Sequence, residues 1–86
     1  MNKKQTEVFI VNDATSGQTL GVMSSLNKAY SRVVFYVTPN LSAALINGKL
    51  PLTMDNFIST WNAWKSIFIE LNGTIILEIS SYKIDE

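Results

Sequence analysis

Two apolar runs joined by Asn72-Gly73 constrain this 86-residue chain more than any other feature of its sequence. The first run reads I-F-I-E-L and the second reads T-I-I-L-E-I. Asn and Gly both tolerate positive φ, which a two-residue type I′ turn requires at both of its central positions. The sequence therefore predicts a C-terminal β-hairpin. Its strands are expected to pair residues at equal distance from the turn: Leu71 with Thr74, Glu70 with Ile75, and Ile67 with Glu78.

This pairing predicts a hairpin with two mostly apolar faces. One face carries Ile67, Ile69, Leu71 and Ile76 with Thr74 and Glu78, and the other carries Phe68, Ile75, Leu77 and Ile79 with Ser66 and Glu70. A half-exposed antiparallel sheet instead alternates apolar and polar side chains. We therefore expect a second copy of the chain to cover the face that the helices leave open. The sequence predicts a homo-oligomer, most simply a dimer.

Two further segments, residues 6–12 and residues 32–38, are rich in β-branched and aromatic side chains and predict strands. Between them, apolar residues at helical spacing predict a helix within residues 19–31: Leu20, Met23, Leu26 and Tyr30. The alternative for the start of this segment is a β-hairpin, in which residues 19–23 pair back onto residues 8–12.

The next segment allows two interpretations. Asn40 suits a helix N-cap, and a short helix would then run through Leu45 and end at Asn47-Gly48. We expect this helix. The alternative is a hairpin that turns at Asn47-Gly48 and holds Pro51 in its return strand.

A longer amphipathic helix is expected from the N-cap candidate Thr53 to about Lys65, with Asp55 near its positive end. Its apolar residues recur at spacings of three and four: Met54, Phe57, Ile58, Trp61 and Trp64. Residues three apart lie roughly 300° apart around a helix, so the two Trp residues cannot both face the centre of the buried stripe. We expect Trp61 in the core and Trp64 near the edge of the stripe.

These elements predict one α+β domain over residues 1–86. We expect a four-stranded mixed or antiparallel sheet, with two to three helices packed on one face and the β-hairpin at its C-terminal end. The alternative is a mostly β fold with one helix.

The composition excludes several classes of function. The chain has no Cys and no His, so thiolate catalysis, the usual zinc sites and the commonest general base are absent. Seven basic residues balance seven acidic ones, which argues against a binder of double-stranded nucleic acid. The predicted register places Glu70 and Glu78 on opposite faces, so we do not expect a catalytic carboxylate pair. We expect no enzyme activity, no catalytic residue, no metal site and no cofactor.

The segment V-F-I-V-N-D-A-T-S-G-Q-T-L (residues 8–20) resembles the phosphate-binding loop of phosphoribosyltransferases. In that family an apolar strand leads through paired acids and a Thr/Ser-Gly turn into a helix. Asn12 stands in place of one acid, the loop is one residue shorter, and so small a chain lacks the rest of the enzyme fold. The resemblance therefore implies binding of an anion or nucleotide without catalysis. The residues that it assigns to this role are Asp13, Thr15, Ser16, Gly17 and Gln18.

Aromatic residues give the remaining indication of function. Packing in the core accounts for most of them, but Phe57, Trp61 and Trp64 are also candidates for contact with a partner, because Trp and Tyr dominate binding hot spots. We therefore expect a small non-enzymatic protein-protein binding module, an inhibitor or adaptor. The alternative is a small-ligand, nucleotide or anion-binding protein that uses residues 13–18.

No segment has the pattern of a targeting sequence, and no run approaches the roughly 18 apolar residues that a membrane-spanning helix needs. We therefore expect a cytoplasmic protein without a membrane partner. The frequent use of Asn, Ile, Ser and Lys indicates an AT-rich bacterial or phage genome. A phage-encoded antagonist of a host system fits a chain of this size.

Overall fold

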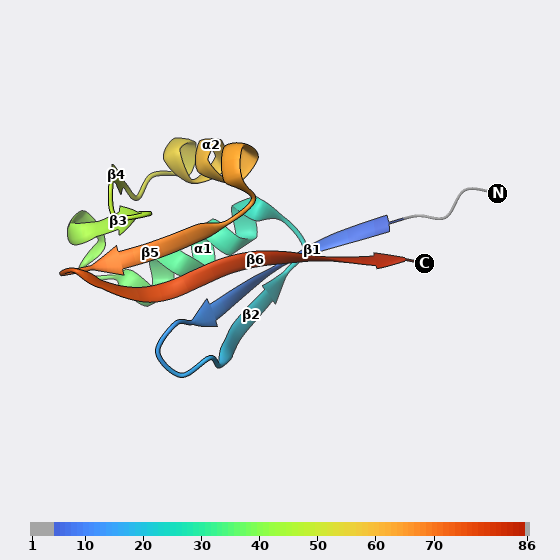
Figure 1. Cartoon of the computed structure of the whole chain (residues 1–86), viewed down its shortest axis with the longest axis horizontal. Helices are drawn as coiled ribbons and strands as arrows, with labels where there is room; N and C mark the ends of the chain where they lie inside the picture. Colours follow the sequence, from blue (N-terminus) through green and yellow to red (C-terminus); the bar gives the residue numbers. More distant parts are fainter. Residues whose placement is uncertain (1–4, 86) are drawn as a thin grey trace.

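An antiparallel sheet of six strands, in the order β2-β1-β6-β5-β3-β4, forms one layer of the computed structural model, which describes residues 5–85 (Figure 1). Two helices, α1 (Leu26–Val37) and α2 (Met54–Trp64), and the short 3₁₀ helix η1 (Leu41–Ala43) complete the regular structure of these residues. The strands are β1 (Gln5–Asp13), β2 (Thr19–Met23), β3 (Ala44–Ile46), β4 (Leu50–Pro51), β5 (Ile67–Leu71) and β6 (Thr74–Asp85). The chain is α+β as expected, but the predicted four-stranded sheet with two to three helices is wrong.

Residues 32–37 belong to helix α1 and not to a strand as predicted. Ser25 caps this helix, because its side chain accepts a hydrogen bond from the backbone N–H of Lys28 at 3.2 Å. The buried residues of α1 recur every four positions along one side: Ala29, Val33 and Val37. The strand prediction rested on the local preference of β-branched and aromatic residues, and burial of this stripe against the sheet outweighs that preference.

The hairpin that the sequence left as an alternative for residues 19–23 is the one that forms. Strand β2 pairs with β1 in antiparallel fashion, so the helix predicted within residues 19–31 is wrong in its N-terminal half. Gly21 lies within this strand, and a Cβ at that position would meet only the flexible end of Met23 and lie at ordinary contact distance from Arg32.

Asn47-Gly48 is likewise a turn between strands and not the end of a helix. Both residues have positive φ, 54° and 72°, and they join β3 to the edge strand β4, where Pro51 is tolerated. Asn47 also ties this turn to β5. Its backbone N–H donates to the Phe68 carbonyl and its side-chain oxygen accepts from the Phe68 N–H, both at 2.8 Å. The helix predicted from Asn40 is therefore wrong, and η1 is the only helical turn there.

Helix α2 and the C-terminal hairpin agree with their predictions. Thr53 caps α2, because its hydroxyl accepts from the N–H of Asn56 at 3.1 Å. Lys65 ends the helix in the left-handed conformation, with φ at 55°. Asn72 and Gly73 form the turn between β5 and β6 with φ at 53° and 82°.

The pairing of this hairpin follows the predicted register next to the turn and departs from it between Glu70 and Ile69. Glu70 lies opposite Ile75 as expected, but Phe68 lies opposite Glu78, because Ile76 is an extra residue that forms a β-bulge. A shift of one residue moves every later side chain of β6 to the other face of the sheet. Glu70 and Glu78 therefore share one face, and the prediction that they lie on opposite faces is wrong.

The bulge gives the sheet one buried face and one exposed face. Both helices cover the buried face, and α1 lies behind the sheet in the view of Figure 1. This face carries the apolar core residues of four strands: Phe9, Val11, Ala44, Ile46, Ile67, Ile69, Leu77 and Ile79. The open face mixes the carboxylates of Glu70 and Glu78 with Phe68, so the hairpin does not have two equally apolar faces. The two apolar faces from which the dimer was predicted are therefore not formed, while the dimer itself stays a prediction.

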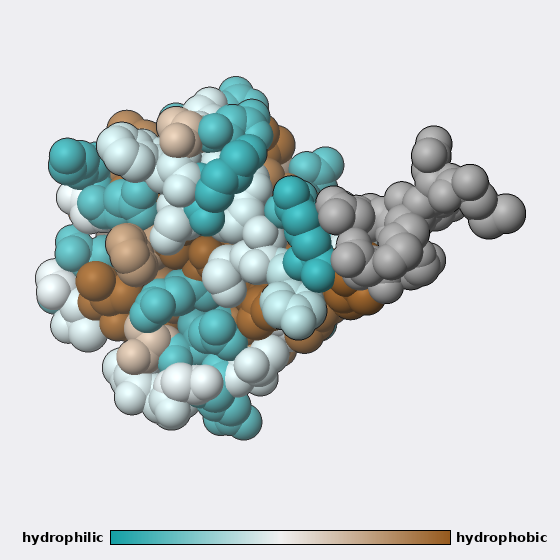
Figure 2. Space-filling view, turned by 45° about the vertical axis from the view of Figure 1, so that its right-hand side comes forward, coloured by the Kyte–Doolittle hydropathy of each residue, from teal (hydrophilic) through white to brown (hydrophobic). Residues whose placement is uncertain are grey.

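The N-terminal end of β1 and the C-terminal end of β6 extend beyond the rest of the domain as a two-stranded arm (Figure 1). In this arm, residues 5–8 pair with residues 82–85, whereas the pairing of β2 and β5 with these strands stops at Phe9 and Ile79. The longest extent of the molecule is 49 Å, against 26 and 18 Å in the other directions. Figure 2 shows apolar and polar residues interspersed on the side from which the arm projects.

Candidate functional site

The loop of residues 13–18, expected to bind an anion, uses its own hydrogen-bond donors within the chain. Every backbone N–H from Asp13 to Gln18 has an acceptor. The N–H of Thr15 and that of Ser16 donate to the Asp13 carboxylate at 2.8 and 3.3 Å, and the N–H of Gly17 donates to the Asp13 carbonyl at 2.8 Å. The loop also joins two strands, so it does not present the N-terminus of a helix as the phosphate-binding loop does.

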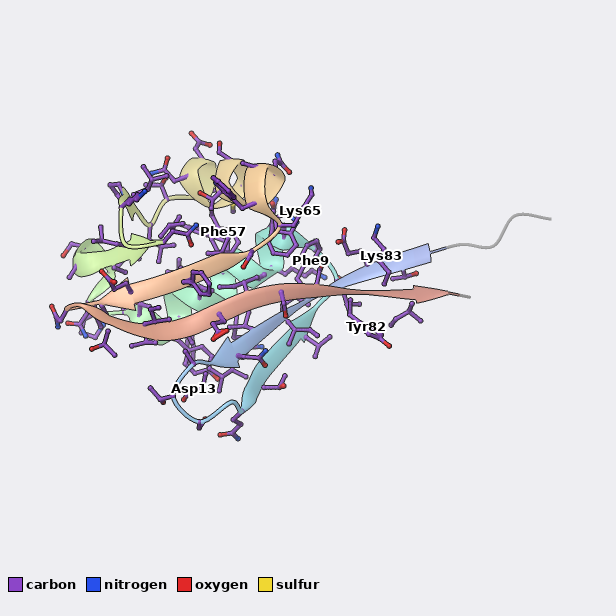
Figure 3. The ribbon with its side chains drawn as sticks, viewed as in Figure 1. Phe9, Asp13, Phe57, Lys65, Tyr82 and Lys83 are labelled. Atoms are coloured by element: carbon purple, nitrogen blue, oxygen red, sulfur yellow. The ribbon has the colours of Figure 1, made fainter. Side chains whose placement is uncertain are left out.

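Asp13 gives this loop a negative centre. The Thr15 hydroxyl donates to its carboxylate at 2.6 Å, and this bond, together with the two backbone N–H groups, holds the pKa of Asp13 below its usual value. The candidates do lie together in one turn that begins at the end of β1, where Figure 3 labels Asp13. Asp13 is partly buried, and the other four are exposed: Thr15, Ser16, Gly17 and Gln18. To an anion, the turn presents a negatively charged carboxylate and no free backbone donor among residues 13–18.

The three aromatic candidates of helix α2 separate into two groups. Phe57 is buried and packs edge to face against Tyr30, with 5.4 Å between ring centroids. Trp61 is 3% exposed, whereas Trp64 is 74% exposed, as the helical spacing led us to expect. Of the three, Trp64 alone has its side chain available on the surface of the folded domain.

Trp64 borders a hollow of about 190 Å³ between α2 and the β3–β4 turn. The hollow is lined by Ile46, Asn47, Lys49, Leu50, Thr60 and Trp64. Leu50 is exposed beside the indole, and Lys49 supplies the one charge. We call Trp64, Leu50, Lys49 and Thr60 the Trp64 surface.

The elements around the Trp64 surface are held in place from both sides. The N–H of Lys65 donates to the Trp61 carbonyl at 2.7 Å and closes the last turn of α2. The two hydrogen bonds between Asn47 and Phe68 fix the β3–β4 turn against β5. The Trp64 surface therefore presents an aromatic side chain from a scaffold held by hydrogen bonds, which suits recognition of a partner. The residues of this surface do not form a general acid–base pair or a nucleophile–base pair.

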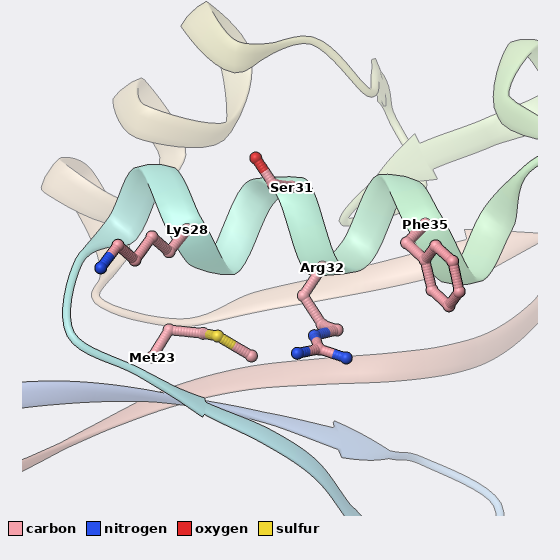
Figure 4. A pocket seen from close by; sticks show the side chains of 5 residues that line it. All are labelled: Met23, Lys28, Ser31, Arg32 and Phe35. Atoms are coloured by element: carbon pink, nitrogen blue, oxygen red, sulfur yellow. The ribbon is translucent and has the colours of Figure 1, made fainter.

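A second hollow, of about 380 Å³, lies between α1 and β2 (Figure 4). Its lining residues are Met23, Lys28, Ser31, Arg32 and Phe35. The sequence prediction missed this group, because it assigned residues 32–38 to a strand. The i, i+4 spacing of Lys28 with Arg32 and of Ser31 with Phe35 would have indicated it once the helix was known.

The remaining classes of site are not found in the part of the chain that the structure describes. Within residues 5–85, no group of three or more His, Cys, Asp and Glu residues is placed to hold a metal ion. Neither helix of this part has the length and apolar character of a membrane span. No family model, curated protein or solved structure matches the chain.

Proposed function

We propose that the protein is a small non-enzymatic protein-protein binding module, a cytoplasmic inhibitor or adaptor, that contacts its partner through the Trp64 surface. The observation that supports this proposal is the exposure of Trp64 on a helix whose other aromatic residues, Phe57 and Trp61, are anchored in the core. Trp is enriched among the residues that contribute most to binding energy. A side chain carried by a rigid helix also loses little conformational freedom on binding.

A single exposed apolar residue is common on folded proteins and would not support this proposal alone. Trp64 differs from such a residue because exposed Leu50 and a hollow lie next to it. A partner can therefore cover the indole and place a side chain into the hollow at once. Such a contact removes water around a central aromatic residue, which is the arrangement typical of hot spots.

Affinity capture tests the proposal. Tagged wild-type protein and two variants, Trp64→Ala and Tyr36→Ala, are incubated with lysates of candidate bacterial hosts, and the proteins retained are identified by mass spectrometry. Tyr36 is the matched control, since it is an exposed aromatic residue of α1 that lines neither hollow. We expect a protein that wild type and Tyr36→Ala retain and Trp64→Ala loses.

The dissociation constant of that protein then decides the matter. Loss of a hot-spot Trp costs 2 kcal/mol or more, so Trp64→Ala should weaken binding by about 30-fold or more. Circular dichroism must show that each variant remains folded. A partner bound equally well by Trp64→Ala contradicts the proposal, and so does a wild-type protein that retains no protein above the control.

A further inference from the structure

The hollow between α1 and β2 combines positive charge with apolar surface. Met23 reaches into it from β2, while Lys28, Arg32 and Phe35 project from α1 (Figure 4). Phe35 is 72% exposed, and Arg32 points from the helix towards the sheet. We call Met23, Lys28, Ser31, Arg32 and Phe35 the α1 groove.

The two cations of the α1 groove have no carboxylate partner among the described residues. The ammonium group of Lys28 donates to the Ser24 hydroxyl at 3.2 Å, and no ion pair forms with it or with Arg32 within residues 5–85. The sequence explains this, since residues 14–54 contain Lys28, Arg32 and Lys49 but no Asp or Glu. The acidic residues of the open face lie across the sheet from α1.

The position of Lys28 also works against the stability of its own helix. It lies in the first turn of α1, where the helix dipole is positive, and that turn holds no acidic residue. A cation at this end is unfavourable, because the N–H groups of the first turn already carry partial positive charge. Positions that break a local rule of stability are concentrated at functional sites. The N-terminal end of α1 and the side chains of Lys28 and Arg32 therefore carry positive charge that no carboxylate of the described residues compensates, and Phe35 lies on the same side of the helix beyond Arg32.

We propose that the α1 groove binds an acidic segment of a protein partner that also carries an apolar side chain. Carboxylates of the segment pair with Lys28 and Arg32, and the apolar side chain packs against the exposed ring of Phe35. This inference rests on the proposed function, that the protein binds another protein, and it adds a contact surface separate from the Trp64 surface. The guanidinium of Arg32 suits a carboxylate, because it donates two parallel hydrogen bonds to it.

The shape and charge of the groove favour an acidic peptide over a nucleic acid. A single-stranded nucleic acid is held by a row of cations that follows successive phosphates, together with stacking of its bases. The α1 groove has two cations, four residues apart on one helix, and the chain as a whole has no net charge. Two carboxylates with an apolar side chain close by match these two cations and Phe35 better than a phosphate backbone does.

Titration of the full-length ¹⁵N-labelled protein with synthetic peptides tests the inference by NMR. The probe is a blocked peptide Asp-Glu-Leu-Asp-Glu. One control peptide, Asn-Gln-Leu-Asn-Gln, removes its charge, and another, Asp-Glu-Ser-Asp-Glu, removes its apolar residue. We expect saturating amide shifts at the α1 groove residues with the probe, and weaker binding of both controls. Absence of shifts at millimolar probe, or equal binding of the uncharged control, would overturn the inference.

Charge reversal in the groove makes the test specific. Arg32→Glu should weaken binding of the probe by about tenfold, because it replaces an attraction by a repulsion. Lys65→Glu changes the net charge by the same amount at an exposed residue that lines neither the α1 groove nor the hollow beside Trp64, and it should leave binding unchanged. An equal loss with Lys65→Glu would overturn the inference. So would tighter binding of oligothymidylate than of the probe, or shifts at the same residues caused by raising the protein concentration alone.

The outcomes separate this inference from the proposed function. If the peptide fails to bind while Trp64→Ala still loses a captured partner, the α1 groove is wrong and the Trp64 surface stands. If the peptide binds as expected and Trp64→Ala retains every captured partner, the Trp64 surface is wrong and the groove stands.

Discussion

The indole of Trp61 packs edge to face against the ring of Phe9, with 5.4 Å between the two ring centroids. This contact joins α2 to β1 through the centre of the core. Trp64 follows one turn later on the same helix and lies on the surface. The two Trp residues are therefore expected to serve different purposes, Trp61 stability and Trp64 binding.

Alanine substitution of each Trp measures this difference. Trp61→Ala removes a buried aromatic side chain and should lower the free energy of unfolding by about 3–5 kcal/mol. Trp64→Ala removes an exposed one and should lower it by less than about 1 kcal/mol. Urea unfolding followed by circular dichroism measures both values without depending on Trp fluorescence. Equal losses for the two variants would contradict the placement of Trp64 on the surface.

A second prediction about stability follows from the β-bulge at Ile76. It places Ile79 in the core and leaves Ile75 exposed, although an unbroken hairpin would put both on one face. Ile79→Ala should therefore lower the free energy of unfolding by about 2–5 kcal/mol, and Ile75→Ala by less than about 1 kcal/mol. The two variants carry the same substitution in the same strand, so each is the control for the other. Similar losses in urea unfolding would indicate that the bulge is absent.

Local chemistry was sufficient to predict some elements of this fold. The Asn72-Gly73 turn and the Thr53 cap depend on a few neighbouring residues, and both formed where the sequence placed them. The strand predicted for residues 32–38 failed, because its β-branched residues also satisfy a helical stripe that only the sheet can bury. The Ile76 bulge has no local signal, and it reversed the faces of β6.

Among the candidate sites, too, the features set by neighbouring residues were predicted and those set by the tertiary structure were not. The exposure of Trp64 followed from helical geometry alone, and the structure places it as expected. The α1 groove could not be predicted, because Met23 belongs to a strand that was predicted as helix, whereas Arg32 and Phe35 belong to a helix that was predicted as strand. Anion binding by the loop of residues 13–18 was predicted from residue type alone. The hydrogen bonds of this loop depend on the β1–β2 hairpin, which was only the alternative prediction for residues 19–23.

The lowered pKa of Asp13 predicts a pH dependence of stability. Hydrogen bonds from the Thr15 hydroxyl and from the Thr15 and Ser16 N–H groups favour the ionised carboxylate in the folded state. A carboxyl whose pKa is lower folded than unfolded stabilises the fold above the unfolded pKa, about 3.9 for Asp. That contribution is lost as the pH falls from there through the folded pKa.

Asp13→Asn tests this pH dependence. The variant should be less stable than wild type at neutral pH, and the difference should disappear as the pH falls below about 4 towards the folded pKa. Urea unfolding of both proteins between neutral and strongly acidic pH measures the difference. Thr15→Val removes the largest cause of the shift, so Asp13→Asn should have a smaller effect in that background. A difference that is independent of pH would contradict the assignment.

The β1–β6 arm gives the predicted dimer a new physical basis in place of the hairpin faces. Two-stranded ribbons are marginally stable in water, and their unpaired edges favour pairing with another strand. The arm carries Tyr82, which is 64% exposed, and Ile84, also exposed, on the face opposite the helices. Figure 3 shows Tyr82 and Lys83 on opposite sides of the arm. The edge of β6 beyond Ile79 has no neighbour within residues 5–85.

We expect two copies to associate through their arms, with β6 beside β6 around a two-fold axis and Tyr82 and Ile84 of both copies covered together. Sedimentation at micromolar concentration should then give twice the mass of one chain, 9.6 kDa. Tyr82→Lys places a charge among these apolar residues and should return the protein to single chains. Phe35→Lys makes a comparable change at another exposed aromatic residue, on α1, and should leave the dimer intact. A wild-type protein with the mass of one chain would refute the dimer, and a dimer that survives Tyr82→Lys would refute its formation through the arm.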